Sequence, residues 1–264
     1  MSQGNGKKGR RIAISLPRQY VNDLIHFGHE IPSIPVQRAM NIKETLEARS
    51  NLRRPPSWVV IFVKAYALTC DVFPQLRRSY LKFPWPHLYE HPDPVASIAI
   101  EKEHAGEPAV SFLRMGDLLN NRLQDLDHCL RQAREQPIQQ LRSYRHAKQM
   151  YWFPASLRRT IWWIGLNVRG SLRAQRFGTF GVSVYASLGA ESLHPISPLT
   201  TTLNYGPITD DGNVNVRLVY DHRVMDGATV ARALAHFEKV LNIQLAEELG
   251  QMSERNLMTK CTIG

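Results

Sequence analysis

The stretch VNVRLVYDHRVMDGATVARALAHFEKVL, residues 214–241, contains the signals of a strand, a turn and a helix in direct succession. Its first part alternates apolar residues with others, and this two-residue period predicts a strand with one apolar face: Val214, Val216, Leu218 and Tyr220. After Gly227 apolar residues recur at helical spacing among alanines, which predicts a helix: Val230, Leu234, Phe237 and Leu241.

The turn between these two elements places a histidine near a carboxylate. His222 follows the end of the predicted strand, and Asp226 comes four residues later, just before the helix. Imidazoles titrate near neutral pH, so a histidine held at a strand end is suited to act as a general base. Asp226 also occupies the position of a helix N-cap, and capping is its alternative role.

The heptapeptide DHRVMDG, Asp221–Gly227, resembles the DHRxxDG motif of 2-oxo-acid dehydrogenase acyltransferases (dihydrolipoyl acyltransferases) and the related motif of chloramphenicol acetyltransferase. Every fixed position of the motif is present. The resemblance covers about residues 11–245 and is strongest at the C-terminal motifs. Upstream stretches resemble further landmarks of that catalytic domain at similar spacing: Ile31–Pro32, Glu47–Arg49, Trp58–Phe73 and Phe73–Leu76.

A second motif, GTFGVS at Gly178–Ser183, is similar to the strand that leads to a hydroxyl residue in this family. The resemblance implies that Ser183 stabilises the oxyanion of a tetrahedral intermediate. The sequence departs from the family after Ser183, and the segment from there to His222 is shorter than in the family. Ser187 is therefore the second candidate for this role.

The resemblance also implies roles for the rest of the turn. His222 would act as the general base, and Asp226 would order the turn together with an arginine, for which Arg11 and Arg18 are the candidates. Gly227 would allow the helix backbone to approach closely. Arg223 would support the structure and take no part in the chemistry.

The function implied is acyl transfer. An acyl group would move from a thioester, either a coenzyme A thioester or an acyl carrier, to a thiol, hydroxyl or amine that attacks directly. The family further implies a homotrimer or a larger trimer-based assembly, in which the histidine and the serine come from adjacent subunits. Two other classes remain open: a noncatalytic scaffold of the same fold, and a peripheral membrane-binding protein.

The 264 residues suit one catalytic domain over 11–250, with a disordered basic tail at 1–10 and a C-terminal tail at 251–264. We expect no lipoyl or subunit-binding domain on this chain. The cysteines are far apart and suggest free thiols in a reducing compartment: Cys70, Cys129 and Cys261. Without a long apolar run, the expected location is cytoplasmic or peripheral at the inner face of the membrane.

The order of elements predicts an α/β (α+β) domain with a mixed sheet, which is the two-layer chloramphenicol acetyltransferase-like fold that the resemblance implies. The expected helices are 17–28, a segment opened by Ser57 that ends before Pro74, 118–135, and the long helix after Gly227. The expected strands are 95–100, 109–113, 178–185, 199–205 and 214–220.

The net charge of +10 arises mostly from Gln136–Ala190, which holds eight basic residues and no acidic one. Within it, residues 137–176 form a basic, aromatic and helical insertion relative to the family. Three interpretations are open: helices that pack on the domain or a neighbouring subunit, an interfacial helix that contacts anionic membrane, or a pocket wall that binds an acyl chain or phosphates. Charge alone also permits nucleic-acid binding, which ranks low because no nucleic-acid module accompanies it.

Two other pairs of histidines, His26 with His29 and His87 with His91, bring no third ligand with them. A structural role is therefore expected for all four, and the sequence predicts no metal site.

Overall fold

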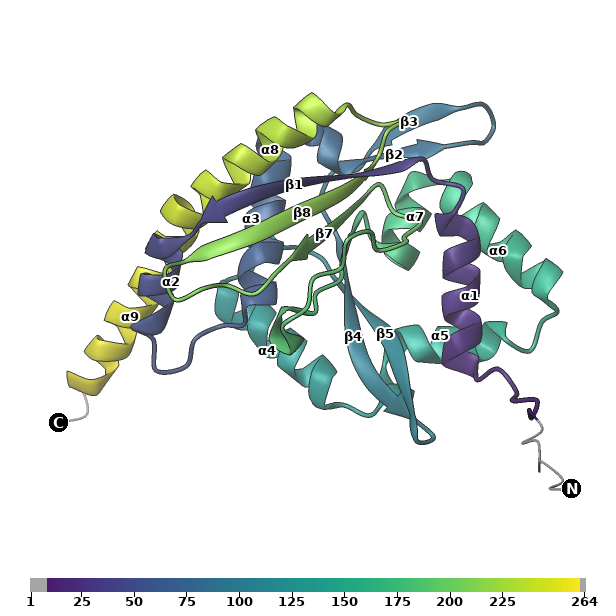
Figure 1. Ribbon diagram of the computed structural model, residues 1–264, viewed down its shortest axis with the longest axis horizontal. Coiled ribbons are helices and arrows are strands. Elements are labelled where there is room, and N and C mark those ends of the chain that lie inside the picture. Colours follow the sequence, from purple (N-terminus) through teal and green to yellow (C-terminus); the bar gives the residue numbers. More distant parts are fainter. Residues whose placement is uncertain (1–8, 262–264) are drawn as a thin grey trace, which may run out of the picture.

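The computed structural model describes residues 9–261, and a six-stranded mixed sheet runs through the molecule (Figure 1). Its strands are β1 (Ser33–Asn41), β4 (Ala96–His104), β5 (Glu107–Met115), β6 (Phe180–Val182), β7 (Thr201–Tyr205) and β8 (Asn213–Asp221). The spatial order is β1-β8-β7-β6-β4-β5. Neighbours of β6 on both sides are parallel to it, and the other pairs are antiparallel.

Helices pack against this sheet, and β2 (Arg78–Leu81) and β3 (His87–Glu90) form a separate hairpin. The helices are α1 (Leu16–Gly28), α2 (Lys43–Ser50), α3 (Trp58–Val72), α4 (Leu123–Glu135), α5 (Arg142–Met150), α6 (Ala155–Asn167), α7 (Gly170–Phe177), α8 (Gly227–Val240) and α9 (Ala246–Cys261). Short 3-10 turns occur at Pro74–Arg77, Ile138–Gln140 and Ala186–Leu188, and a π turn at Leu241–Leu245 joins α8 to α9.

The core lies where α3 and α8 cover one face of the sheet. Phe62 of α3 stacks on Tyr205 of β7 with ring centroids 4.0 Å apart, and Tyr66 stacks on Phe180 of β6 at 4.2 Å. Phe237 of α8 closes the cluster at 5.7 Å from Phe62. Such aromatic pairs add specific geometry to a large buried apolar area, so they fix α3 against β6 and β7.

The elements around the heptapeptide are as predicted. The strand predicted from the alternation of residues 214–220 is observed as β8. The apolar residues predicted for the following helix are all buried. Arg217 and Val219 of β8 are buried as well, because both faces of this strand are covered.

Elsewhere the predicted boundaries need correction. The strand expected over 178–185 is confined to Phe180–Val182, and the helix expected over 118–135 begins only at Leu123. Ser57 does precede α3, but its hydroxyl makes no capping hydrogen bond. Strand β1 and the β2–β3 hairpin had no predicted counterpart.

Residues 137–176 are helical, as expected, and hold α5, α6 and most of α7. Trp162 of α6 is buried against α1, stacked on Phe27 at 5.7 Å and edge-on to Tyr20 at 5.2 Å. Other side chains of the segment are exposed, above all Trp152 at 85%. The packing interpretation thus accounts for part of the segment.

The two predicted tails are only partly within the residues that the structure describes. Residues 1–8 of the expected N-terminal tail and residues 262–264 lie outside the described residues. At the other end, α9 continues through the expected boundary at residue 250 as far as Cys261. Among the described helices, none is both long and apolar enough to cross a membrane.

Candidate functional site

His222 lies in the turn directly after β8, where backbone contacts fix its position. Its backbone N–H donates to the carbonyl of Pro32 at 3.1 Å, just before β1. The imidazole ring lies 5.7 Å from the ring of Tyr220, and its side chain is 44% exposed. A histidine anchored in this way on the sheet still presents its ring nitrogens to a molecule outside the chain.

Asp226 lies at the N-cap position of α8 without a side-chain capping bond. Its Oδ1 is 3.8 Å from Nδ1 of His222, which is beyond hydrogen-bonding distance, and its side chain is 85% exposed. Within residues 9–261, neither Arg11 nor Arg18 forms an ion pair with it. The hydrogen bond and the arginine partner expected for Asp226 are therefore not formed in the single chain.

A different ion pair rigidifies the turn. The carboxylate of Asp221 is buried and accepts from Arg223 at 2.9 Å (Nε) and 2.7 Å (Nη2). The Arg223 guanidinium also lies 4.4 Å above the ring of Tyr80. The structural role expected of Arg223 is consistent with these contacts.

Gly227 starts α8 immediately under Tyr220, as the expected close approach requires. A methyl group at Gly227 would lie 3.2 Å from the Tyr220 hydroxyl, which is tighter than ordinary contact. Burial, together with the negative charge of Asp226, raises the pKa of Tyr220. The phenol of Tyr220 is therefore neutral and lies next to the turn at Gly227.

Ser183 follows β6 and opens onto a cavity of about 350 Å³, which we call the serine cavity. Its backbone N–H donates to the carbonyl of Leu203 at 3.2 Å, and its own carbonyl accepts from the side-chain amide of Asn204. These bonds fix the backbone where β6 ends. Ser183 is therefore placed by the sheet and presents its side chain to the cavity.

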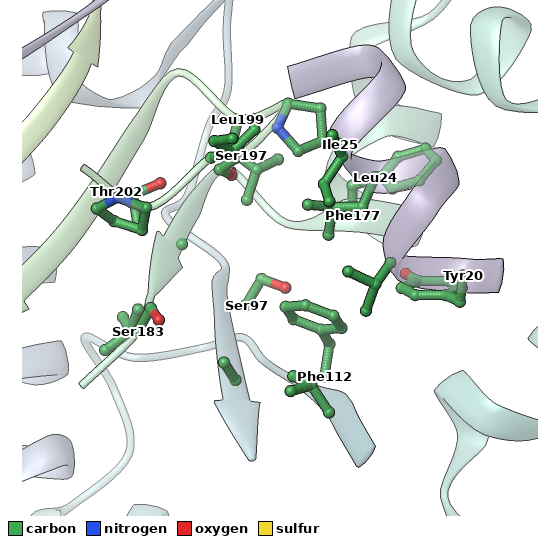
Figure 2. Close-up of a pocket in the computed structure, with 18 of the residues that line it drawn as sticks. Tyr20, Leu24, Ile25, Ser97, Phe112, Phe177, Ser183, Ser197, Leu199 and Thr202 are labelled. Atoms are coloured by element: carbon green, nitrogen blue, oxygen red, sulfur yellow. Dashed lines mark hydrogen bonds between the residues drawn. The ribbon is translucent and has the colours of Figure 1, made fainter. Parts of the chain in front are cut away.

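The wall of the serine cavity is mostly apolar, and the strands add a few polar side chains to it. Figure 2 shows Ser97 and Thr202 near Ser183, and Tyr20 and Leu24 of α1 opposite them. This volume is in the range of small-molecule sites, and such sites combine apolar walls with a few polar groups. Burial raises the pKa of Tyr20 to about 12, so its phenol is neutral at physiological pH.

The two predicted catalytic residues are far apart within one chain. Val182 pairs with Leu203, and Asn204 pairs with Arg217, so Ser183 lies level with Arg217 of β8. His222 is five residues farther along β8, or roughly 17 Å at about 3.4 Å per residue, and two strand spacings add about 10 Å sideways. A separation of roughly 20 Å excludes a shared reaction centre within the chain.

Ser187, the second serine candidate, is exposed in a 3-10 turn and does not line the serine cavity. His194, which no sequence pattern indicated, does line the cavity, and its Nε2 lies 2.8 Å from the hydroxyl of Ser33. His194 lies in an irregular loop without a motif, so only the arrangement in space reveals its proximity to the cavity.

The other predicted groups remain separate from both sites. Cys70 and Cys129 are free thiols, and burial raises the pKa of each. Histidine, cysteine and acidic side chains form no group of three that suits a metal ion within residues 9–253, whose side chains the structure describes. His91 is buried against Ser79 at 2.9 Å, which gives it a structural role.

Solved structures of acetyltransferases have a similar fold. No protein-family model matches this sequence, and no curated protein does. A probable dihydrolipoamide acetyltransferase from Listeria monocytogenes is similar over 93% of this chain and 97% of its own, at 18% identity and a TM-score of 0.63. The cubic core of the pyruvate dehydrogenase multienzyme complex covers 92% of this chain and 94% of its own, at 16% and 0.63.

A further structure, the dihydrolipoamide acetyltransferase of Azotobacter vinelandii, covers 93% of this chain and 96% of its own at 14% identity and a TM-score of 0.67. In that enzyme a serine, a histidine and an asparagine have roles in the catalytic mechanism. The asparagine lies four residues after the histidine. The chain therefore has the fold of these catalytic domains, and the predicted fold class is confirmed.

Proposed function

We propose that this protein is an acyltransferase that moves an acyl group from a thioester, with a coenzyme A thioester as the donor, to a thiol, hydroxyl or amine acceptor. The observation that carries the proposal is the accessible His222, anchored after β8 in a fold shared with dihydrolipoamide acetyltransferases. In the Azotobacter vinelandii enzyme the asparagine lies four residues after the histidine, and Asp226 has the same spacing from His222.

The separation of His222 from Ser183 supports a reaction centre made by two copies of the chain. One copy would supply His222, and its neighbour would supply Ser183 with the serine cavity. The similarity to a cubic core favours a homotrimer or a trimer-based assembly. Oligomerisation would then be required for activity.

In such a centre His222 would take the proton of the acceptor while the acceptor atom forms a bond to the thioester carbon. The oxyanion would accept a hydrogen bond from the Ser183 hydroxyl. When the tetrahedral intermediate collapses, the carbon–sulfur bond breaks and the proton passes from His222 to the leaving thiolate. No covalent intermediate on Ser183 is needed.

The first test is thiol release from a panel of acyl-CoA thioesters in the presence of thiol, hydroxyl and amine acceptors. His222→Ala should lower the rate about 100- to 10,000-fold, and Ser183→Ala should lower it on the order of 100-fold. The matched controls are His128→Ala, an exposed histidine on α4, and Ser187→Ala, and both should retain the wild-type rate. Wild-type turnover by His222→Ala would refute the assignment of the base.

The second test is complementation between the two inactive variants. His222→Ala and Ser183→Ala chains, refolded together, should recover part of the activity because some interfaces then combine an intact histidine with an intact serine. Recovery should be absent when either variant is refolded alone. If the mixture forms oligomers and stays inactive, the centre is not shared between copies.

Membrane contact by residues 137–176 is a second proposal, favoured by large apolar side chains exposed along this segment. These are Trp152, Phe153, Leu157 and Ile164. Aromatic residues beside basic ones suit the headgroup region of an anionic bilayer. At low salt the wild type should float with phosphatidylglycerol vesicles, and the double variant Trp152→Ser/Leu157→Ser should not. Equal flotation of both proteins would contradict this surface.

A further inference from the structure

A second cavity, of about 400 Å³, adjoins the serine cavity and is formed largely by the helices of residues 137–176. We call it the arginine cavity. Five side chains belong to the walls of both cavities, which therefore adjoin along them: Tyr20, Arg114, Trp162, Arg176 and Phe177. Ser183 lines only the serine cavity, whereas Arg142 and His146 line only the arginine cavity, so the arginine cavity extends from the shared wall away from Ser183.

Three guanidinium groups line the arginine cavity, and no carboxylate does. Arg114 comes from β5, Arg142 from α5 and Arg176 from α7, and His146 of α5 adds an imidazole. Within the described part of the chain, none of the three arginines forms an ion pair, and the side chains of Arg142 and Arg176 make no hydrogen bond. Arg114 alone is held in place, because it donates to the carbonyl of Arg176 at 2.8 Å.

Other arginines of the same segment show what such groups do when the chain satisfies them. Arg158 and Arg159 both reach the buried carboxylate of Asp23. Arg173 is buried and donates to three backbone carbonyls. Arg142 and Arg176 differ from these because they are exposed and, among the described residues, unpaired, so their N–H groups can bind a molecule that enters the cavity.

The positive charge in the cavity is unfavourable for its own groups. Burial, together with the charge of Arg142, lowers the pKa of Arg114, although the nearby Tyr20 opposes this. Burial also lowers the pKa of His146, and the surrounding arginines lower it further. An anion among these groups would relieve their mutual repulsion and accept charge-assisted hydrogen bonds from the guanidinium groups.

The remaining wall of the arginine cavity is mostly apolar, with Ser143, Gln149 and Gln175 as polar members. Its large side chains are Met150, Ile161, Trp162, Leu172 and Phe177. Several guanidinium groups at one side and an apolar wall at the other suit a ligand that is charged at one end only. Forked guanidinium donors match phosphate oxygens in particular, because two N–H groups can bind two oxygens at once.

We propose that the arginine cavity binds a small organic phosphate, whose phosphate group lies among Arg114, Arg142 and Arg176 and whose apolar part lies along Trp162 and Leu172. The site shares Arg114 and Arg176 with the serine cavity, but the proposal does not rest on acyl transfer, because its test measures binding alone. The bound phosphate group belongs either to a soluble phosphoester or to the headgroup of a lipid.

The test is calorimetric titration of the purified protein with octyl phosphate, below its micelle concentration, and with inorganic phosphate. Octyl phosphate should bind more tightly, and its affinity should fall as salt is raised. The double variant Arg142→Gln/Arg176→Gln should bind it on the order of 100-fold more weakly, at about tenfold for each lost charge-assisted contact. Lys148→Gln is the matched control, because Lys148 is exposed on α5 outside the cavity wall.

Equal binding of octyl phosphate by the double variant and by Lys148→Gln would overturn the site, as would no binding to the wild type at low salt. Equal affinity for octyl phosphate and inorganic phosphate would overturn the role of the apolar wall. Competition distinguishes the sources. Phosphatidylglycerol vesicles that displace octyl phosphate identify a lipid headgroup, whereas displacement by adenosine diphosphate alone identifies a soluble phosphoester.

Discussion

Removal of the Arg158 guanidinium should destabilise the protein by about 3 kcal/mol. Asp23 of α1 is only 1% exposed, and its carboxylate accepts from Arg158 and, at 2.8 Å, from the hydroxyl of Tyr151. The guanidinium also lies 4.2 Å over the Tyr151 ring. This cluster joins residues 137–176 to α1.

The magnitude follows from what the substitution Arg158→Met leaves behind. Breaking a buried ion pair by removal of one partner costs about 3–5 kcal/mol, because the other charge stays buried. Arg159 remains 3.7 Å from Asp23, but its side chain is 46% exposed, so it offsets at most about 1 kcal/mol. We therefore expect a loss near the lower end of that range.

Urea unfolding followed by tryptophan fluorescence measures this loss, with an unchanged dependence on urea concentration as the sign of two-state behaviour. The double variant Asp23→Leu/Arg158→Met should lie within about 1 kcal/mol of the wild type, because it removes both charges and fills their space. A loss below about 1 kcal/mol for Arg158→Met would refute the reasoning. So would a double variant as unstable as the single one.

Three further substitutions test the buried groups and the backbone. Burial and two neighbouring arginines lower the pKa of His91 from 6.5 to about 4. Its neutral form is thus favoured in the folded state, and stability should be complete above about pH 6.5 and fall by about 3 kcal/mol as the pH drops toward 4. His91→Gln should flatten this dependence in urea unfolding, and an unchanged profile would assign it to other groups. Arg223→Gln leaves the carboxylate of Asp221 buried without its cation, so we expect a loss of about 3 kcal/mol, measured by thermal unfolding. Gly178→Ala should cost about 1–3 kcal/mol, because its φ is +90° and a Cβ would lie 2.9 Å from a carbonyl oxygen. Gly189→Ala, with φ at +71° in open space, is its control and should cost less.

The fold around the heptapeptide could be predicted because its local signals agree with its tertiary environment. The alternating residues before His222 form β8, and the helical period after Gly227 matches the buried face of α8. The sequence of β1, SIPVQRAMN, gives no such signal because only Met40 of its residues is fully buried. Pairing with β8 over the whole of its length is what makes it a strand.

The candidate site was predictable only in part, for a related reason. Motifs identify His222 and Ser183, but no local pattern shows how far apart the sheet holds them. The serine cavity combines α1, β4, β5, β6 and β7 with an irregular loop. Residues such as Ser97 and His194 enter it through the register and topology of the sheet, which a single sequence does not specify.

The segment 137–176 is coupled to the His222 turn through Arg173 of α7. This side chain is buried, and it donates to the carbonyls of Tyr80, Leu166 and Pro198 at 3.2, 3.0 and 2.9 Å. Burial lowers the pKa of Arg173 to about 10, and the negative charge of Asp221 opposes that shift. Arg173 therefore remains charged at neutral pH and attracts the carboxylate of the turn.

Tyr80 is the physical link between the two regions. Its carbonyl accepts from Arg173, while its ring lies under the guanidinium of Arg223, which in turn binds Asp221 beside His222. Removing α7 would leave the carbonyl of Tyr80 without the Arg173 donor and would take a positive charge away from Asp221. Residues 137–176 thus help to position His222, whatever ligand this segment binds, because Arg173, its most deeply buried arginine, supports that turn through Tyr80.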